Sequence, residues 1–324
     1  MKAVILTKYG PPEVLKLQEV EKPTIMEHQV LVKVHATSVT PMDYRLRGAK
    51  APLWPISRIM MGFWKPKQKI PGTEVAGEII EVGKDVTKFK KGDRVFGFGL
   101  GVYAEYFVAS EKANLILMPP SMSYEEGASL GFGGISALYF LKIKGNIQRE
   151  QRVLINGASG GVGVFAVQLG KYFGTEVTGV CSTKNVDLVK SLGADRVIDY
   201  TKEDFTKEKN QKYDIIFDAV GKSTFSKCKK ILKNGGVYLH TVPSYKLFIQ
   251  MFWTSKFGKK KVVTGIADNG NDLVLLKELV ETNKLQVIID RTYPLEQVVD
   301  AHAYADKGHK VGSVVLTLNH KTES

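Results

Sequence analysis

The chain has 324 residues, of which 44 % are hydrophobic, and its formal net charge at pH 7 is +13. This length exceeds the size at which one hydrophobic core keeps growing, so we expect two domains. Two cysteines cannot form a disulfide framework, no apolar run reaches the ~18 residues of a membrane span, and no cleavable signal pattern precedes the first apolar run. We therefore expect a protein of the reducing cytosol without a membrane span.

The positive charge gathers in four lysine-rich clusters, at residues 65–69, 88–91, 227–230 and 256–261. A solvated lysine-rich surface explains them, and no motif of a nucleic-acid-binding module accompanies them. No nucleic acid partner is therefore expected, although the charge would attract an anionic cofactor.

In chain order, residues 1–122 predict a β-rich domain, with strand-like runs at 29–35, 74–82 and 103–108 between Gly and Pro breaks. From residue 123 strands alternate with helices, as a parallel sheet requires. The strand candidates there are 152–156, 176–181, 196–199, 213–219, 236–241 and 261–266. The chain then returns to the first domain through 286–290 and 311–318. We predict one domain of 1–122 with 267–324 and a second of 123–266.

The most informative motif is a glycine-rich turn between the strand at 152–156 and an apolar helical pattern. It consists of Ala158, Ser159, Gly160, Gly161, Val162 and Gly163. Gly160 would let the backbone approach a pyrophosphate, and Gly163 would let the helix lie close to the strand. The N–H groups at the start of the helix would face the phosphates. The motif therefore predicts a dinucleotide-binding unit.

The end of the second strand indicates which dinucleotide. An NAD-selective unit places an acid there, whereas this chain has Ser182, Thr183 and Lys184, and its first acid is Asp187. A carboxylate at this position would repel a 2′-phosphate, so its absence favours NADPH. Alternatively, Ser182 or Thr183 caps the following helix, which is compatible with phosphate binding.

Short matches spread over nearly the whole chain carry a family resemblance. They lie at 1–4, 9–15, 71–77, 82–83, 91–95, 104–106, 192–195 and 312–316, besides the glycine turn. In this order they resemble the zinc-independent medium-chain dehydrogenases/reductases, in particular quinone oxidoreductases of the zeta-crystallin type and NADPH-dependent alkenal/enone oxidoreductases. The resemblance implies a GroES-like partial barrel, a Rossmann domain with a doubly wound parallel sheet, and an active cleft between them.

The resemblance also implies that no metal is bound. Zinc alcohol dehydrogenases of this superfamily carry a Cys and a His where this chain has Thr40 and Thr73. Two threonines cannot supply a tetrahedral zinc site. This favours reduction of a quinone or of an α,β-unsaturated carbonyl by NADPH, with a hydrophobic small molecule as acceptor. The alternatives are a non-catalytic, crystallin-like NADPH-binding protein and, with less support, an alcohol dehydrogenase.

Matching to the family suggests further cofactor contacts, namely Ser136, Tyr200, Val220, His240, Thr241 and Val242. Ser136 would donate its hydroxyl near the nicotinamide, although a Ser inside a helix is an equal alternative. Tyr200 would lie near the 2′-phosphate. His240 is either a contact or a structural histidine.

The proton donor is expected in the segment 40–45, where relatives carry Asn-Pro-x-Asp. Asp43 matches this pattern, Tyr44 could donate a proton, and Arg45 could orient a phosphate or an enolate. Two alternatives stay open: Asp43 and Arg45 pair to shape a loop, or solvent supplies the proton.

Two apolar segments and one strand edge complete the expectations. Residues 49–70 could wall the substrate site, and residues 245–257 could cap the nicotinamide, form a subunit contact or touch a membrane surface. The strand at 261–266 would leave an open edge, on which a second copy could pair, so we expect a homodimer. The lysines at 259–261 argue against that pairing.

Overall fold

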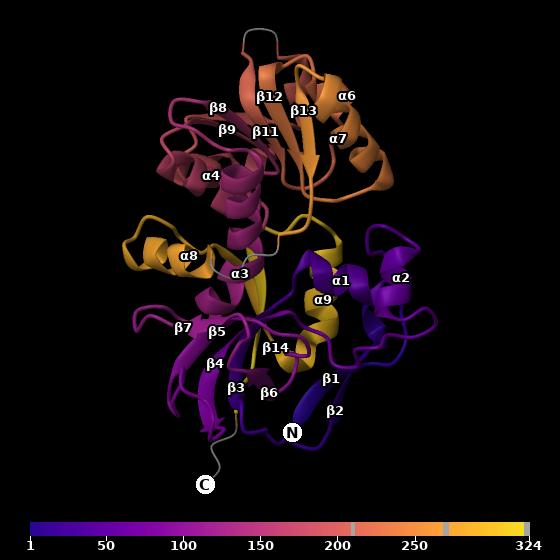
Figure 1. The fold of residues 1–324 in the computed structure, drawn as a ribbon, viewed down its shortest axis with the longest axis vertical. Helices are drawn as coiled ribbons and strands as arrows, with labels where there is room; N and C mark the ends of the chain where they lie inside the picture. The colour runs from indigo at the N-terminus through magenta and orange to yellow at the C-terminus, as the bar shows by residue number, and fades with distance from the viewer. Residues whose placement is uncertain (209–210, 268–271, 321–324) are drawn as a thin grey trace. The chain divides into compact units, whose positions relative to one another are not determined.

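The computed structural model describes residues 1–208, 211–267 and 272–320, and the chain divides into two compact units (Figure 1). The first unit comprises Met1–Phe132, Leu273–Glu281 and Val287–Ser324, and the second comprises Gly133–Asp272 and Thr282–Gln286. The division falls within helix α3 (Tyr124–Leu138), whereas the boundary that we predicted at residues 122 and 123 lies before this helix.

The second unit is built on a six-stranded sheet in which all neighbouring strands are parallel. Its order is β10-β9-β8-β11-β12-β13, so the chain starts at the centre, winds outward in one direction and then in the other. The strands are β8 (Arg152–Asn156), β9 (Glu176–Cys181), β10 (Arg196–Asp199), β11 (Tyr213–Asp218), β12 (Leu232–His240) and β13 (Lys261–Thr264). This doubly wound sheet confirms the predicted Rossmann fold.

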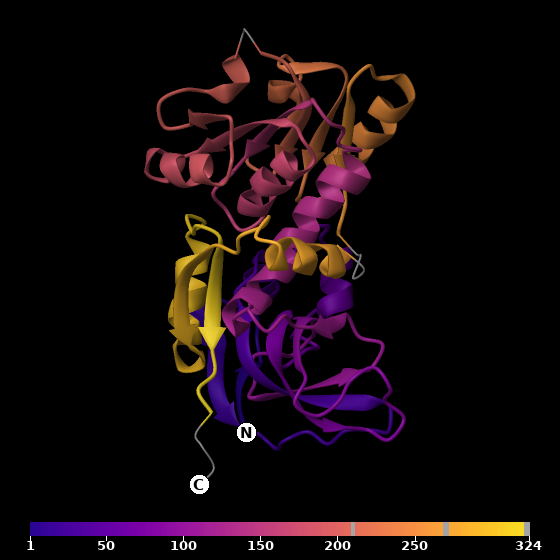
Figure 2. The ribbon, with the colours of Figure 1, turned by 90° about the vertical axis from the view of Figure 1, so that its left-hand side faces the viewer.

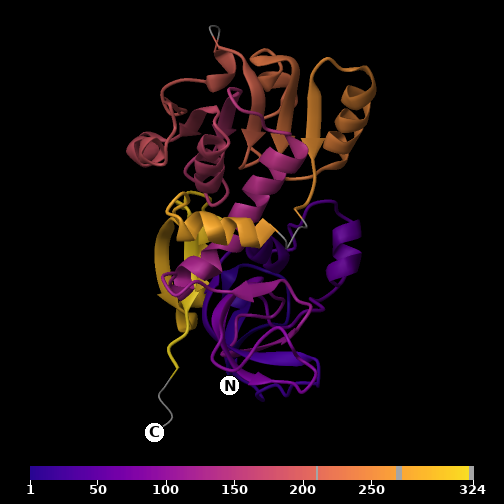
Figure 3. The same ribbon diagram turned by 60° about the vertical axis from the view of Figure 1, so that its left-hand side comes forward.

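The central strands of this sheet are almost entirely apolar because helices cover them. Leu154, Val180 and Ile216 share a buried cluster with Phe225 and Leu247, which belong to two of the covering helices. The helical segments of the unit are α4 (Gly163–Tyr172), α5 (Val186–Ser191), α6 (Phe225–Cys228), α7 (Tyr245–Phe257), the π-helix η2 (Tyr139–Lys144) and the 3-10 turns η3 (Thr183–Asn185) and η4 (Phe205–Lys207). Figure 3 shows α7 beside β13, the last strand of the sheet, against which it packs.

The first unit is dominated by a seven-stranded, mainly antiparallel sheet of order β14-β15-β3-β4-β5-β7, with β6 paired to β3. These strands are β3 (Gln29–Ser38), β4 (Glu74–Val82), β5 (Arg94–Phe98), β6 (Tyr106–Ser110), β7 (Leu115–Leu117), β14 (Ile289–Pro294) and β15 (Ser313–Thr317). Figure 2 shows the C-terminal strands, in yellow, beside the N-terminal ones, in indigo, as the pairing of β15 with β3 requires. Strands from near the two ends of the described chain thus share one sheet.

The remaining elements of the first unit surround this sheet. They are the hairpin β1 (Lys2–Leu6) and β2 (Leu15–Glu19), the helices α1 (Pro41–Arg47), α2 (Ile56–Met61), α8 (Asp272–Glu281) and α9 (Val298–Asp306), and the 3-10 turns η1 (Pro12–Val14) and η5 (Leu295–Gln297). Alternate residues of β3, namely Val30, Val32 and Val34, are fully buried in the core. Among the described residues, no helix has both the length and the apolar character to cross a bilayer.

Candidate functional site

The predicted cofactor contacts of the second unit lie where the parallel strands end. The glycine turn follows β8, Ser182 follows β9, Tyr200 follows β10, Val220 follows β11 and Thr241 follows β12. Carboxyl ends of parallel strands share one edge of a sheet, which is where such folds bind their ligands. The structure therefore brings these residues to a common edge.

The glycine turn is held in a conformation that only small residues allow. Gly157 has φ +82°, and a Cβ on Gly163 would lie 2.0 Å from the Gly157 carbonyl oxygen. Gly163 thus lets α4 begin directly against the turn. No side chain caps the N-terminus of α4, which leaves this helix end open to an anion, although the Val164 N–H already donates to the Gly160 carbonyl at 3.0 Å. Gly157 was missed by the sequence analysis, which began the motif at Ala158.

Two neighbouring segments fix the turn in place. The N–H groups of Gly157 and Ala158 both donate to the Val180 carbonyl on β9, each at 3.0 Å. A Cβ on Gly133 of α3 would lie 2.2 Å from the Gly161 carbonyl oxygen, so α3 also contacts the turn. Ser136 is buried one helical turn further along α3.

The tip of β9 carries the groups expected at the adenosine 2′-phosphate. Asn185 Nδ2 donates to Ser159 Oγ at 2.9 Å and to Ser182 Oγ at 3.4 Å, which links this tip to the glycine turn. Lys184 is exposed, and Tyr200 donates its backbone N–H to the Cys181 carbonyl at 3.0 Å. Ser182 and Tyr200 thus follow neighbouring strands of the sheet, and Lys184 lies two residues beyond Ser182.

Thr183 is already engaged, because its hydroxyl donates to Asp199 Oδ2 at 2.6 Å. This hydrogen bond is the main cause that lowers the pKa of Asp199 to about 2. Asp199 was not among the predicted site residues, although a carboxylate at the end of β10 is visible in the sequence. Its bonds to Thr183 and Thr201 hold the loop after β10.

Asp218, another residue that the sequence analysis missed, organises the ends of β11 and β12. This fully buried carboxylate accepts hydrogen bonds from Asn156 Nδ2 (2.9 Å), Gly221 N (2.9 Å), Ser223 N (2.7 Å) and the Tyr238 hydroxyl (3.1 Å). Together with Lys222 N at 3.4 Å, these donors satisfy the charge that burial would otherwise penalise. The carboxylate thereby fixes the loop that carries Val220.

Around this loop, the predicted contacts play different parts. Val220 is partly exposed and lies over the glycine turn, since a Cβ on Gly157 would be 2.4 Å from Val220 Cγ1. The Thr241 hydroxyl donates to the Ala219 carbonyl at 3.3 Å. His240 accepts from Val242 N at 3.2 Å, and burial lowers its pKa, so a neutral structural role fits it.

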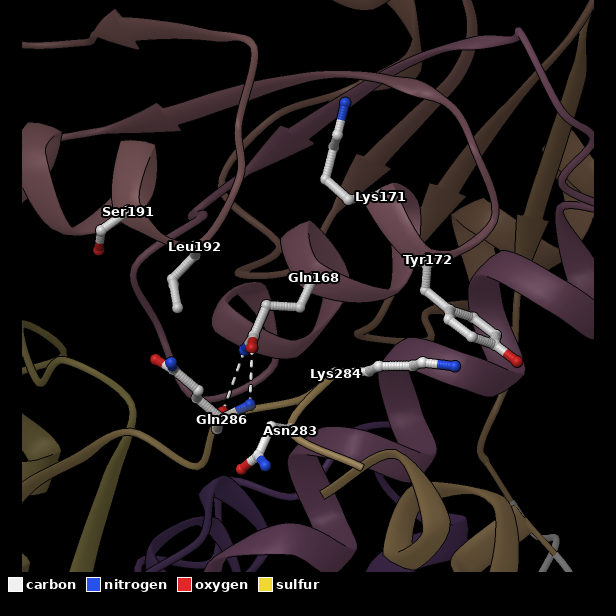
Figure 4. Close-up of a pocket in the computed structure, with 8 residues that line it drawn as sticks. All are labelled: Gln168, Lys171, Tyr172, Ser191, Leu192, Asn283, Lys284 and Gln286. Carbon is white, nitrogen blue, oxygen red and sulfur yellow. Dashed lines mark hydrogen bonds between the residues drawn. The ribbon is translucent and has the colours of Figure 1, made fainter. Parts of the chain in front are cut away.

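A pocket of about 250 Å³ in the second unit lies away from this edge. Figure 4 shows its lining by Gln168, Lys171, Tyr172, Ser191, Leu192, Asn283, Lys284 and Gln286. The Gln168 amide donates to and accepts from the Gln286 backbone, at 3.0 and 2.7 Å. Because Lys171 and Tyr172 end α4, whereas the glycine turn begins it, this pocket is separate from the dinucleotide-binding edge.

In the first unit, a buried cluster forms at the start of α1 from Thr40, Asp43 and Thr73. Thr40 and Asp43 make a capping box, with Thr40 Oγ1 at 2.7 Å from Asp43 Oδ2. Thr73 Oγ1 donates to Asp43 Oδ1 at 3.2 Å and lies 3.4 Å from Thr40 Oγ1. Burial raises the pKa of Asp43 to about 6.

The two threonines thus stand at the expected zinc-ligand positions and bind a carboxylate instead. Zinc in proteins is bound by Cys, His or carboxylate ligands. Two threonine hydroxyls that hydrogen-bond to one carboxylate do not provide such a ligand set. Over the described residues, no group of three or more His, Cys, Asp or Glu is placed to hold a metal ion.

A second buried carboxylate, Glu74, follows Thr73 directly. It accepts from the Ser38 hydroxyl and from the Phe132 N–H, and burial raises its pKa to about 7. The sequence placed Glu74 only at the start of a strand. Its burial depends on contacts with residues far along the chain, which no local pattern indicates.

A pocket of about 250 Å³ in the first unit adjoins the Thr40–Asp43–Thr73 cluster. Its lining is mostly apolar and consists of Met42, Thr73, Phe98, Gly99, Leu100 and Asn114. Thr73 belongs both to this lining and to the cluster. Thr73 therefore borders both the buried acid and this mostly apolar pocket.

Tyr44 and Arg45 do not join Asp43. The Tyr44 ring packs against the hydrophobic core, and Arg45 lies in the last turn of α1. The bonds that Asp43 makes to Thr40 and Thr73 take the place of the alternative Asp43–Arg45 pair, which is absent from the described residues.

The apolar segment 49–70 contains α2 and is fixed to the N-terminal strand region by Tyr9. The Tyr9 hydroxyl donates to the Met61 and Gly62 carbonyls, at 3.0 and 2.8 Å, and Arg58 stacks on its ring. Trp54, Met60, Phe63 and Trp64 are exposed, and Met61 is partly so. None of these side chains lines the pocket described above.

Known proteins match this architecture over both units. The alcohol dehydrogenase GroES-like domain matches residues 26–120, and a family described as zinc-binding dehydrogenase matches residues 192–316. A chloroplastic quinone oxidoreductase of Triphysaria versicolor is 35 % identical and covers 98 % of each chain. A chloroplastic NADPH-dependent alkenal/one oxidoreductase of Arabidopsis thaliana is 32 % identical over 98 % of this chain and 79 % of its own.

These names contradict the expectation of a cytosolic protein. Relatives are named as chloroplastic, and others as mitochondrial, so their names point to an organelle. The expectation rested on a low cysteine count, which indicates a reducing compartment. The cytosol is only one such compartment, and the inference was therefore wrong in choosing it.

Among solved structures, a quinone oxidoreductase from Coxiella burnetii has a TM-score of 0.88 and 31 % identity, and the match covers 98 % of this chain and 99 % of that one. Sequence, fold and the glycine turn agree with each other across the chain. The chain therefore belongs to the quinone oxidoreductases of the medium-chain dehydrogenase/reductase superfamily.

Proposed function

We propose that this protein is an oxidoreductase that uses NADPH to reduce quinones or α,β-unsaturated carbonyl compounds. The observation that carries the proposal is Thr73, a residue that lines an apolar pocket and whose hydroxyl donates to the buried Asp43. The names of the relatives support it, since they include quinone oxidoreductases and an NADPH-dependent alkenal/one oxidoreductase. In this proposal residues 123–266 hold the cofactor, and residues 1–122 with 267–324 hold the acceptor.

The glycine turn would accept the pyrophosphate of NADPH at Gly160. The nearest atom to a Cβ built on Gly160 is 3.4 Å away, so the protein itself does not fill this side of the backbone and a phosphate could approach it. The uncapped N–H groups of α4 would bind the phosphate oxygens, and Ser182, Lys184 and Tyr200 would bind the 2′-phosphate. Val220, Thr241 and Val242 would lie near the nicotinamide end, with Ser136 as a further donor. When bound, NADPH supplies the hydride.

The residues of the first unit would complete the reaction. A hydride added to an enone or quinone leaves negative charge on oxygen, which a nearby donor must neutralise. Thr73 donates to Asp43 when the carboxyl group is ionised. When Asp43 is protonated, this hydrogen bond would reverse, so that Asp43 donates to Thr73 and the Thr73 hydroxyl gives its own proton to the acceptor. Asp43 suits this role because its raised pKa keeps part of the population protonated near neutral pH. The assignments of Tyr44 and Arg45 remain predictions.

The test is NADPH oxidation with a panel of quinones and enones, comparing wild type with Thr73→Val. Thr73→Val keeps the shape of the pocket and removes the hydroxyl, so turnover should fall while NADPH binding is unchanged. A flat absorbance trace with every acceptor, together with measurable NADPH binding, would favour the non-catalytic alternative.

An alcohol dehydrogenase is tested separately by elemental analysis and by a chelator. We expect no stoichiometric zinc and no loss of turnover. If the chelator inhibited turnover and added zinc restored it, the proposal would be contradicted. Turnover would then depend on a metal ion, although Thr40 and Thr73 occupy the expected ligand positions.

We also propose that the protein is a homodimer, as expected from the free edge of the sheet at β13. One group of that edge is already used, because Val262 N donates to Thr254 Oγ1 at 3.1 Å. Light scattering at micromolar concentration tests the dimer, and a mass near the 35.9 kDa of one chain would refute it.

A further inference from the structure

Helix α7 presents an apolar surface to solvent that the proposed reaction does not use. Its outward residues, here named the aromatic face, are Phe248, Ile249, Phe252, Trp253 and Phe257. Their spacing of three or four residues places them on one side of the helix. Exposures of 58 % for Trp253 and 75 % for Phe257 are far above those of core aromatic residues.

The opposite side of α7 attaches the helix to the sheet. Leu247 is buried in the core of the unit, and Thr254 accepts from the Val262 N–H of β13. The helix therefore lies along the last strand, as Figure 3 shows, and cannot turn its aromatic face inward without breaking these contacts. This face is a fixed surface feature.

The charge of the surrounding chain is strongly one-sided. Residues 219–267 contain ten lysines and neither Asp nor Glu. Lys256 lies on the aromatic face, with Nζ 4.7 Å from the centre of the Phe252 ring. In the part of the chain that the structure describes, Lys246, Lys256 and Lys259 are not paired with a carboxylate. Their charge is therefore available to an external anion.

We propose that α7 docks the protein on the surface of an anionic lipid bilayer. Phe and Trp side chains on one helix face, together with lysines near them, are the features of a helix that lies in the headgroup region. The lysines supply attraction to anionic headgroups, and the aromatic side chains supply apolar contact with the acyl boundary. The helix would lie on the membrane and would not cross it.

The positive charge around α7 also favours an anionic bilayer over a second copy of the chain as the partner of the aromatic face. A two-fold contact through α7 would bring Lys246, Lys256 and Lys259 close to the same lysines of the partner copy, and like charges at an interface are unfavourable. A single-stranded nucleic acid needs a groove with aromatic platforms. The aromatic face is the outward side of a helix, and it includes the aliphatic Ile249.

The experiment is co-sedimentation of the full chain with vesicles of phosphatidylcholine, alone or mixed with phosphatidylserine. We expect binding to the mixed vesicles that weakens as salt is added. The double substitution Phe252→Ser, Trp253→Ser should reduce binding at least about tenfold. Lys256→Gln should reduce it about fivefold, and only on the anionic vesicles. Ile143→Ser, which changes another exposed apolar residue of the same unit, serves as the control and should have no effect.

Tryptophan fluorescence gives a second readout. The chain has three tryptophans, so a Trp54→Phe, Trp64→Phe background leaves Trp253 alone. Its emission should shift to the blue when anionic vesicles are added. Each variant is first checked for NADPH binding, so that loss of folding is recognised.

Three outcomes would overturn the proposal. The first is equal binding to neutral and anionic vesicles, or none to either. The second is a doubled mass in solution that Phe252→Ser, Trp253→Ser abolishes, because the face would then be covered by a second copy. The third is binding of a single-stranded oligonucleotide that depends on the same residues while vesicles do not bind.

Discussion

Thr73 Oγ1 lies 3.2 Å from Asp43 Oδ1 and at the same time lines an apolar pocket of about 250 Å³. In zinc-dependent members of the superfamily the corresponding residue is expected to be a metal ligand. Here it is a neutral hydroxyl backed by an acid. In the proposed function the same position would serve a different chemical purpose, which is to deliver a proton.

Asp43→Asn should lower turnover by roughly ten- to a hundredfold, since general acids contribute on the order of 10²–10⁴ and water can replace part of this. In the wild type the rate of the chemical step should rise as pH falls from 8 to 6, because the carboxyl group is protonated below its pKa of about 6. The variant should lose this dependence. Single-turnover kinetics across this range measures both effects.

Met42→Leu is the matched control, because it alters the same pocket without removing a proton donor. A pH profile of Asp43→Asn identical to that of the wild type would show that solvent supplies the proton.

Glu74→Gln should make stability less dependent on pH. The pKa of Glu74 is raised by burial from 4.5 to about 7, so its favourable contribution is present below pH 4.5 and is lost as pH rises through 7. A shift of this size corresponds to about 3 kcal/mol, at ~1.4 kcal/mol per pKa unit. The variant should be more stable than the wild type at pH 8 and not at pH 4.

Urea unfolding midpoints at several pH values measure this difference. The partly exposed Glu78 lies on the same strand, and Glu78→Gln should leave the pH dependence unchanged. A parallel shift of Glu74→Gln at all pH values would contradict the titration of this carboxyl group.

Gly160→Ala and Gly163→Ala should separate cofactor binding from folding. The Cβ of Ala at 160 has no neighbour nearer than 3.4 Å, so the protein should fold, yet this methyl group would obstruct the pyrophosphate. At 163 the Cβ would lie 2.0 Å from a backbone oxygen, so stability should fall by about 2 kcal/mol or more. Thermal unfolding and NADPH titration distinguish the two. Equal destabilisation by both substitutions would show that the turn is not shaped for a ligand.

Lys184→Ala should weaken NADPH binding about tenfold, which equals ~1.4 kcal/mol for a charge-assisted contact at an exposed site, and should leave NADH binding unchanged. Fluorescence titration with both cofactors measures this. Lys190→Ala, which removes another exposed lysine from the next helix, is the control. An equal loss for both cofactors would place Lys184 away from the 2′-phosphate.

The sequence predicted those features that depend on local patterns. The buried runs of the parallel sheet, the helix after the glycine turn and the close approach of Gly163 all follow from periodicity and residue size. Asp218 was missed because its partners Asn156 and Tyr238 lie on other strands, far along the chain. Glu74 was missed for the same reason, since the groups that bury it come from β3 and α3.

The sequence also suggested more catalytic residues than the structure gathers. Tyr44 and Arg45 follow Asp43 directly, but successive residues of a helix point in different directions. Only Asp43 faces Thr40 and Thr73, while Tyr44 turns to the core. The hydrogen bonds of the cluster thus involve Asp43, while the roles expected for Tyr44 and Arg45 stay predictions.

The hydrogen bond from Val262 N on β13 to Thr254 Oγ1 on α7 links two proposed binding surfaces, the strand edge for a second copy and the aromatic face for a bilayer. A second copy that pairs along β13 must first displace Thr254, whereas a bilayer that holds α7 by its outer side leaves this bond intact. Dimer formation through the strand edge and attachment to lipid are then linked equilibria of opposite sign. Adding vesicles should dissociate such a dimer, and raising the protein concentration should release protein from the vesicles.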